Sequence, residues 1–74
     1  MTPQEAVSNA RWLLGIARSA DQAASRNLTR AMRAGHGGRI LAAAARHKTA
    51  SDKYADRRAE LIEAIKAAIK AAQA

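Results

Sequence analysis

The chain has 74 residues, no cysteine, and thirteen Lys or Arg against six Asp or Glu, which gives a formal net charge of +7. This length allows one domain with a small core, and the lack of cysteine excludes disulfides and thiolate metal sites. No apolar stretch approaches the ~20 residues of a bilayer-spanning helix. The N-terminus also lacks a basic region followed by an apolar one, so we expect neither a membrane span nor a secretory signal.

The first predicted element is a long helix over residues 3–34. Its start is marked by Thr2, which can cap a helix, and by Pro3, which suits the first helical position. Glu5 completes a capping box with Thr2. No further proline occurs in the chain, so nothing in this region interrupts the helix.

A seam of small and apolar residues runs along this first helix with a seven-residue period. Its members fall into two interleaved sets, Val7, Leu14 and Leu28 in one and Ala10, Ala17, Ala24 and Ala31 in the other. This spacing is typical of a helix that packs against another helix, and the alanines favour a close approach. Asp21 is the one polar residue in the series, and we expect it to pair with Lys48 or Lys53 and to set the register.

A glycine-rich turn over residues 35–38 is predicted next, followed by a second helix over residues 39–73. The predicted inner face of this helix consists of Ile40, Ala44, His47, Ser51, Tyr54, Arg58, Leu61, Ile65, Ala68 and Ala72, broadened by Leu41, Ile62 and Ile69. Thr49 and Asp52 can form a second capping box. The sequence therefore leaves open a kink or break near residues 48–51, which would give a three-helix bundle.

We expect the two long helices to form an all-α antiparallel hairpin. If the chain reverses near His36, the numbers of facing residues sum to about 73. The apolar residues near the N-terminus then meet those near the C-terminus, and the polar residues meet in the middle. The predicted seam consists of Val7, Ala10, Leu14, Ala17, Leu28, Leu61, Ile65 and Ile69. Because much of the apolar content is alanine, the core is small, and we expect self-association into a homo-oligomer or larger assembly.

Basic residues concentrate around the predicted turn. Six Lys or Arg and no Asp or Glu lie between residues 26 and 48. A hairpin would gather them into a cationic tip, where arginine forks and the first backbone N–H groups of the second helix match phosphate oxygens. The candidate phosphate-binding residues are Arg26, Arg30, Arg33, Gly37, Gly38, Arg39, Arg46 and Lys48.

The sequence indicates a binding protein and not an enzyme. The chain has no cysteine nucleophile, its two histidines lie eleven residues apart on either side of the turn, and a two-helix protein offers little concavity for a substrate. We expect no cofactor and no metal ion. The main hypothesis is sequence-independent binding of nucleic acid in the cytoplasm or within a virion, with an acidic protein surface as the other possible partner. The alternative hypothesis is a structural assembly or adaptor protein whose alanine-rich seam packs against helices of a partner.

Overall fold

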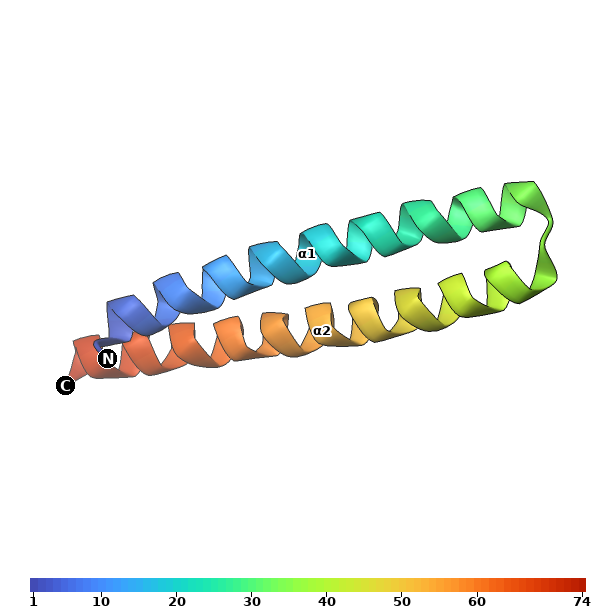
Figure 1. The fold of residues 1–74 in the computed structure, drawn as a ribbon. Helices are drawn as coiled ribbons and strands as arrows, with labels where there is room; N and C mark the ends of the chain where they lie inside the picture. Colours follow the sequence, from blue (N-terminus) through green and yellow to red (C-terminus); the bar gives the residue numbers. More distant parts are fainter.

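The computed structural model describes all 74 residues as two long antiparallel helices joined by a tight turn (Figure 1). Helix α1 spans Pro3–Ala34 and helix α2 spans Gly37–Gln73. The molecule is a rod of 57 × 15 × 13 Å, with both termini at one end and the turn at the other. The predicted all-α hairpin is therefore confirmed. Neither helix contains a segment apolar enough to cross a lipid bilayer.

The start of α1 follows the predicted capping box. The Thr2 hydroxyl oxygen accepts a hydrogen bond from the backbone N–H of Glu5 at 3.1 Å, and the hydroxyl donates to the Glu5 carboxylate at 3.1 Å. Pro3 occupies the first helical position, where its missing N–H costs nothing. These contacts satisfy backbone donors that the first turn of a helix otherwise leaves without a partner.

Gly35 ends α1 in the left-handed conformation, with φ of 72° and ψ of 17°. Its N–H donates to the carbonyl oxygens of Ala31 and Met32, which closes the last turn of the helix. The left-handed conformation costs a residue with a side chain about 1–2 kcal/mol. Gly35 is therefore the glycine that the chain reversal requires.

The turn is shorter than predicted, because α2 begins at Gly37 and not at residue 39. The backbone N–H of Ile40 donates to the carbonyl oxygen of His36 at 3.0 Å, which places Gly37 and Gly38 inside the first turn of α2. From there α2 continues without a break to Gln73. The Thr49 hydroxyl donates to the Ala45 carbonyl at 3.1 Å instead of capping a new helix, so the three-helix alternative is not adopted.

The core of the hairpin is a line of contacts between the helices, and its only fully buried residues are Ala10, Ala17 and Ala43. The other predicted seam residues of α1, including Leu14 and Leu28, are partly buried. No large side chain is fully buried. The alanines let the two helices approach closely, and the stability of the hairpin comes from many small contacts.

The inner face of α2 differs from the predicted one. Its least exposed residues are Ile40, Ala43, His47, Ala50, Ser51, Tyr54, Arg57, Leu61, Ala64 and Ala68. The predicted face also contained residues that the structure leaves exposed, namely Leu41, Ala44, Arg58, Ile62, Ile65, Ile69 and Ala72. Thus Leu61 lies in the seam, whereas Ile65 and Ile69 are 37% and 54% exposed. The physical reason is helix geometry: hydrophobicity alone favoured the isoleucines, whereas Ala64 and Ala68 follow Leu61 at intervals of three and four residues and complete the surface that faces α1.

Candidate nucleic-acid interface

The net charge of the molecule lies almost entirely at the end that carries the turn. We call residues 22–51 the turn half, and residues 1–21 together with 52–74 the open half. The turn half contains six Lys or Arg and no acid, whereas the open half contains seven Lys or Arg and six acids. The turn half therefore carries +6 of the formal charge of +7. Figure 1 shows residues 22–51 as the half of the rod that contains the turn, so these charges belong to that half.

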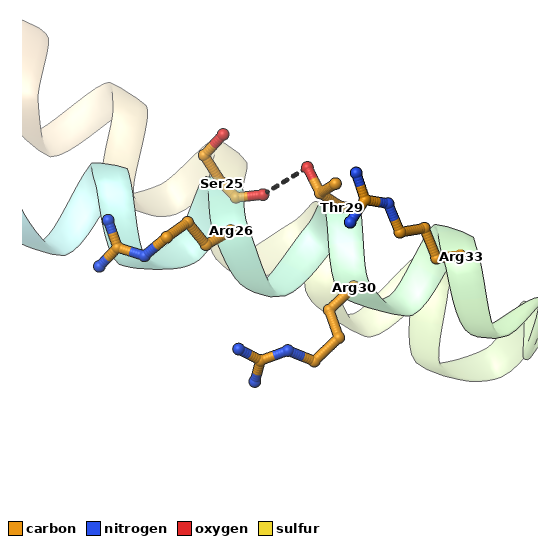
Figure 2. A pocket seen from close by; sticks show the side chains of 5 residues that line it. All are labelled: Ser25, Arg26, Thr29, Arg30 and Arg33. Carbon is orange, nitrogen blue, oxygen red and sulfur yellow. Dashed lines mark hydrogen bonds between the residues drawn. The ribbon is translucent and has the colours of Figure 1, made fainter.

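Three of the arginines share one surface of α1. Arg26, Arg30 and Arg33 line a shallow hollow together with Ser25 and Thr29 (Figure 2). All three side chains are exposed, and none has a carboxylate within ion-pair distance. Their spacing of four and three residues keeps them on one side of the helix, where like charges repel. Figure 2 shows the three guanidinium groups spread apart, each open to an approaching anion.

The other basic residues of the turn half belong to α2. Arg39 and Arg46 are exposed and lie outside the hollow, and neither has an acidic partner. Lys48 differs, because its Nζ lies 2.8 Å from a carboxylate oxygen of Asp52. This hydrogen bond and the charge of Asp52 raise the pKa of Lys48 above its usual value. The turn half therefore presents five unpaired arginines, while Lys48 already has a counter-charge.

The backbone at the start of α2 is open as well. His36 precedes the helix and makes no side-chain capping bond, and the first turn contains no acidic residue. The first N–H groups of a helix have no acceptor within the helix, and at Gly37 and Gly38 no side chain covers them. A Cβ atom added at either glycine would meet nothing within 4 Å. The fold therefore does not require glycine at these two positions, in contrast to Gly35.

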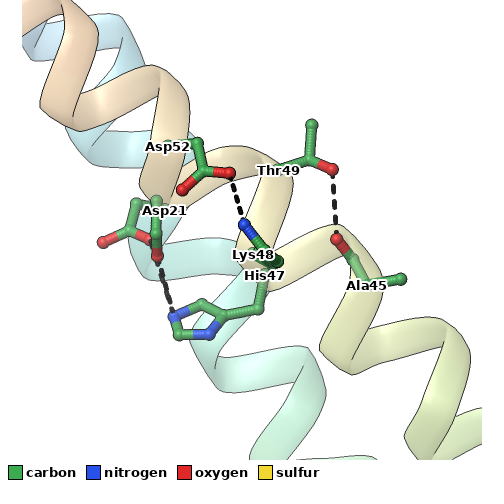
Figure 3. A network of polar contacts seen from close by, with 7 residues as sticks. Asp21, Ala45, His47, Lys48, Thr49 and Asp52 are labelled. Carbon is green, nitrogen blue, oxygen red and sulfur yellow. Dashed lines mark hydrogen bonds and ion pairs between the residues drawn. The ribbon is translucent and has the colours of Figure 1, made fainter.

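A polar cluster lies halfway along the interface between the helices (Figure 3). The Ser51 hydroxyl donates to the Asp21 carboxylate at 2.6 Å, and His47 Nε2 lies 3.5 Å from the same carboxylate oxygen. Asp21 therefore contacts Ser51 and His47, and the predicted pairing with Lys48 or Lys53 is wrong. The Asp21–Ser51 contact agrees with the expected sum of about 73 for facing residues.

The residue types in this cluster are those of a hydrolase triad, but their arrangement is different. In a triad the serine hydroxyl gives its proton to the histidine, and the acid holds the far nitrogen of the ring. Here the serine hydroxyl points to Asp21 at 2.6 Å, and the His47 Nε2 is 3.4 Å from the serine oxygen. We therefore interpret the cluster as a polar layer that fixes the register of the two helices. No group of three His, Asp or Glu is arranged to hold a metal ion.

The open half has the opposite character. Its charges are partly paired along α2, with Arg57 to Glu60 at 2.9 Å and Lys66 to Glu63 at 3.3 Å. Six of the eight large apolar side chains that the molecule exposes also lie in this half, namely Met1, Trp12, Ile16, Ile62, Ile65 and Ile69. Trp12 and Ile16 line a second hollow with Lys53 and Arg57. This end of the rod is suited to apolar contact more than to anion binding.

The sequence identified the arginines of the hollow but not its two hydroxyl residues, Ser25 and Thr29. The Thr29 hydroxyl donates to the Ser25 carbonyl oxygen at 3.1 Å, as Figure 2 shows. Ser25, Thr29 and Arg33 follow one another at intervals of four residues, and this was the available signal, because residues at this spacing share a helix surface.

Comparison of the chain with protein-family models, with curated proteins and with solved structures finds no match. The functional assignment therefore depends on the charge distribution and geometry of this molecule.

Proposed function

We propose that the protein binds the phosphate backbone of nucleic acid, without sequence preference, through its turn half. The observation that supports this proposal is the set of five exposed, unpaired arginines in a region without acids, Arg26, Arg30, Arg33, Arg39 and Arg46. Arginine guanidinium groups donate two parallel hydrogen bonds to phosphate oxygens and stay charged at every physiological pH. Lys48 is a weaker contributor, since phosphate must compete with Asp52 for its charge.

The glycines at the start of α2 add to the phosphate-binding surface. Gly37 and Gly38 are not needed for the chain reversal, and glycine is a poorer helix former than alanine. A phosphate can approach uncovered N–H groups at the positive end of the helix dipole. The access that these glycines give to the backbone is consistent with a ligand at this end of the rod.

Sequence-independent binding is the mode that the residues of the turn half favour. The only aromatic residues that could stack on bases, Trp12 and Tyr54, lie in the open half, and Tyr54 is partly buried in the seam. The two helices side by side, each about 10–12 Å across with its side chains, are together wider than the ~12 Å major groove of duplex DNA. The end of the rod as a whole therefore meets the phosphates at the groove edges, and such contacts carry no sequence information.

The alternative role, an adaptor that packs its alanine seam against a partner helix, meets a specific obstacle. The alanines of that seam, Ala10 and Ala17, are buried against α2 within the same chain. A partner could use them only after the hairpin opened. The exposed surface of the turn half carries five unpaired arginines beside two exposed apolar side chains, Met32 and Leu41, and its charge favours an anionic partner over an apolar helix.

The proposal is tested by fluorescence anisotropy with two duplexes of equal length and unrelated sequence. We expect equal affinities for both. With five phosphates neutralised, the association constant should fall about 500-fold between 50 and 200 mM salt. Poly-glutamate serves as the control anion: binding of poly-glutamate in preference to both duplexes would point to an acidic protein partner. The absence of binding to either duplex at 50 mM salt would overturn the proposal.

A further inference from the structure

One side of α2 in the open half carries a line of apolar residues that the hairpin covers only in part. It consists of Ile62, Ile65, Ile69 and Ala72, and we call it the isoleucine strip. Ile62, Ile65 and Ile69 are 45%, 37% and 54% exposed. The spacing of three, four and three residues places all four on one side of the helix, as in the contact line of a coiled coil. Nothing in the single hairpin uses this strip.

The single chain also exposes more surface than a compact protein of its size. Its accessible surface is 5619 Å², whereas a compact monomer of this mass exposes about 4,400 Å². The excess of about 1,200 Å² is spread along the whole elongated rod, so it shows that the chain leaves surface available for a second copy and does not measure the area of the strip. With three alanines as its only fully buried residues, the hairpin has both the surface and the need for a second packing partner.

We infer that the isoleucine strip packs antiparallel against the isoleucine strip of a second copy of this chain. The spacing of the strip is the same when it is read in either direction, as a two-fold symmetric interface requires. With the symmetry axis next to residue 67, Ile65 faces Ile69 of the second copy and Ile62 faces Ala72 of the second copy. Each isoleucine thereby meets an apolar residue, and the pair forms a four-helix assembly at the overlap.

The charge distribution supports this geometry. Two turn halves side by side would bring together two charges of +6, whereas the open halves carry a net charge of +1 each. Antiparallel packing through the open halves keeps the two turn halves at opposite ends of the assembly, where solvent and salt screen their repulsion. If the proposed function is correct, this dimer carries a phosphate-binding surface at each end and can bridge two nucleic-acid segments.

Sedimentation equilibrium in the absence of nucleic acid tests the inference independently of the proposed function. We expect the wild-type chain to have twice its monomer mass of 7.9 kDa. Ile65→Glu should raise the dimer dissociation constant at least about 100-fold, because it buries an unpaired carboxylate in the interface. The matched control is Ile16→Glu on α1, which is 50% exposed and lies outside the strip, and it should leave the dimer intact.

The helix content of each variant is checked by circular dichroism, so that dissociation is not confused with unfolding. If Ile65→Glu loses helix content, Ile69→Glu replaces it, because that side chain is more exposed in the hairpin. A wild-type chain that stays monomeric at about 100 µM would overturn the inference. It would also be overturned if Ile16→Glu dissociated the dimer while Ile65→Glu did not, or if the chain were monomeric and bound anionic lipid vesicles through the strip.

Discussion

The two halves of the hairpin are built from the same two helices, yet their charged side chains are arranged differently. In the open half, basic residues such as Arg57 and Lys66 pair with acids one turn away. In the turn half, Arg26, Arg30 and Arg33 stand on one surface without any acid, although each repelling pair costs about 0.2–0.5 kcal/mol. Arg33 lies in the last turn of α1, where a cation interacts favourably with the helix dipole. No acid offsets the mutual repulsion of the three arginines, and a bound anion would relieve it.

Charge reversal in the turn half is the most direct test of the difference between the two halves. The double substitution Arg30→Glu and Arg33→Glu should lower the affinity for duplex DNA about 100-fold at 100 mM salt, because it removes two phosphate contacts and adds two repulsions. The matched control is Arg11→Glu with Arg18→Glu, which changes the charge equally at unpaired arginines of the open half. The control should lose less than about 10-fold in the same anisotropy assay. Equal losses in both variants would mean that total charge, and not the turn half, determines binding.

Enlarging a buried alanine tests how closely the two helices approach each other. Ala17→Leu should lower the free energy of unfolding by about 1–3 kcal/mol, since the seam has no room for the larger side chain. Ala59→Leu, on the exposed surface of α2, should change it by less than about 0.5 kcal/mol. Urea denaturation followed by circular dichroism measures both. A stabilising effect of Ala17→Leu would show that the seam has room for a larger side chain.

The polar layer at the boundary between the halves should contribute more than an exposed ion pair does. Asp21→Ala leaves the partly buried Ser51 and His47 without their partner, and we expect a loss of about 1–2 kcal/mol in the free energy of unfolding. Asp52→Ala removes only an exposed pair with Lys48, so its effect should stay below about 0.5 kcal/mol. The same urea titration compares the two variants, and equal effects would argue against a structural role for Asp21.

Alanine substitutions at Gly37 and Gly35 should have small and opposite effects on the free energy of unfolding, and Gly37→Ala also tests binding. Gly37→Ala should raise the free energy of unfolding by about 0.5–1 kcal/mol, because the position is helical and nothing obstructs a Cβ atom. Gly35→Ala should lower it by about 1–2 kcal/mol, since φ is 72° there. If Gly37 also serves phosphate binding, the stabilised variant should bind duplex DNA more weakly than wild type. Unchanged affinity would show that Gly37 is not part of the phosphate-binding surface.

Much of the fold could be predicted from the sequence, because its signals are local. The capping residues at Thr2 and Glu5 and the seven-residue repeat of α1 predicted a helix over residues 3–34, which the structure confirms. The positive φ of Gly35 agrees with a glycine reversal. The two extra glycines were assigned to the loop because glycine is typical of loops, and the helical conformation of Gly37 and Gly38 could not be inferred from residue type.

The inner face of α2 could not be predicted because it depends on the distance between the helices. Reading the sequence by hydrophobicity favoured Ile65, whereas the structure places Ala64 towards α1. Leu61, Ala64 and Ala68 share the surface that faces α1, and this choice among neighbouring apolar residues follows from how the two helices pack and not from hydrophobicity. In the same way, the partner of Asp21 was expected to carry a positive charge, but a serine hydroxyl and a histidine one turn apart reach the carboxylate first. The grouping of the arginines followed directly from their spacing.

The salt dependence of DNA affinity is the most direct measurement of whether the turn half binds phosphates. The slope of log K against log salt counts the phosphates that a protein neutralises, at about 0.9 per phosphate. Arg30→Gln with Arg33→Gln should reduce the magnitude of that slope by about 1.8, and Arg11→Gln with Arg18→Gln should leave it unchanged. A slope that the first pair leaves intact, or that both pairs reduce equally, would contradict a phosphate-binding site at the turn.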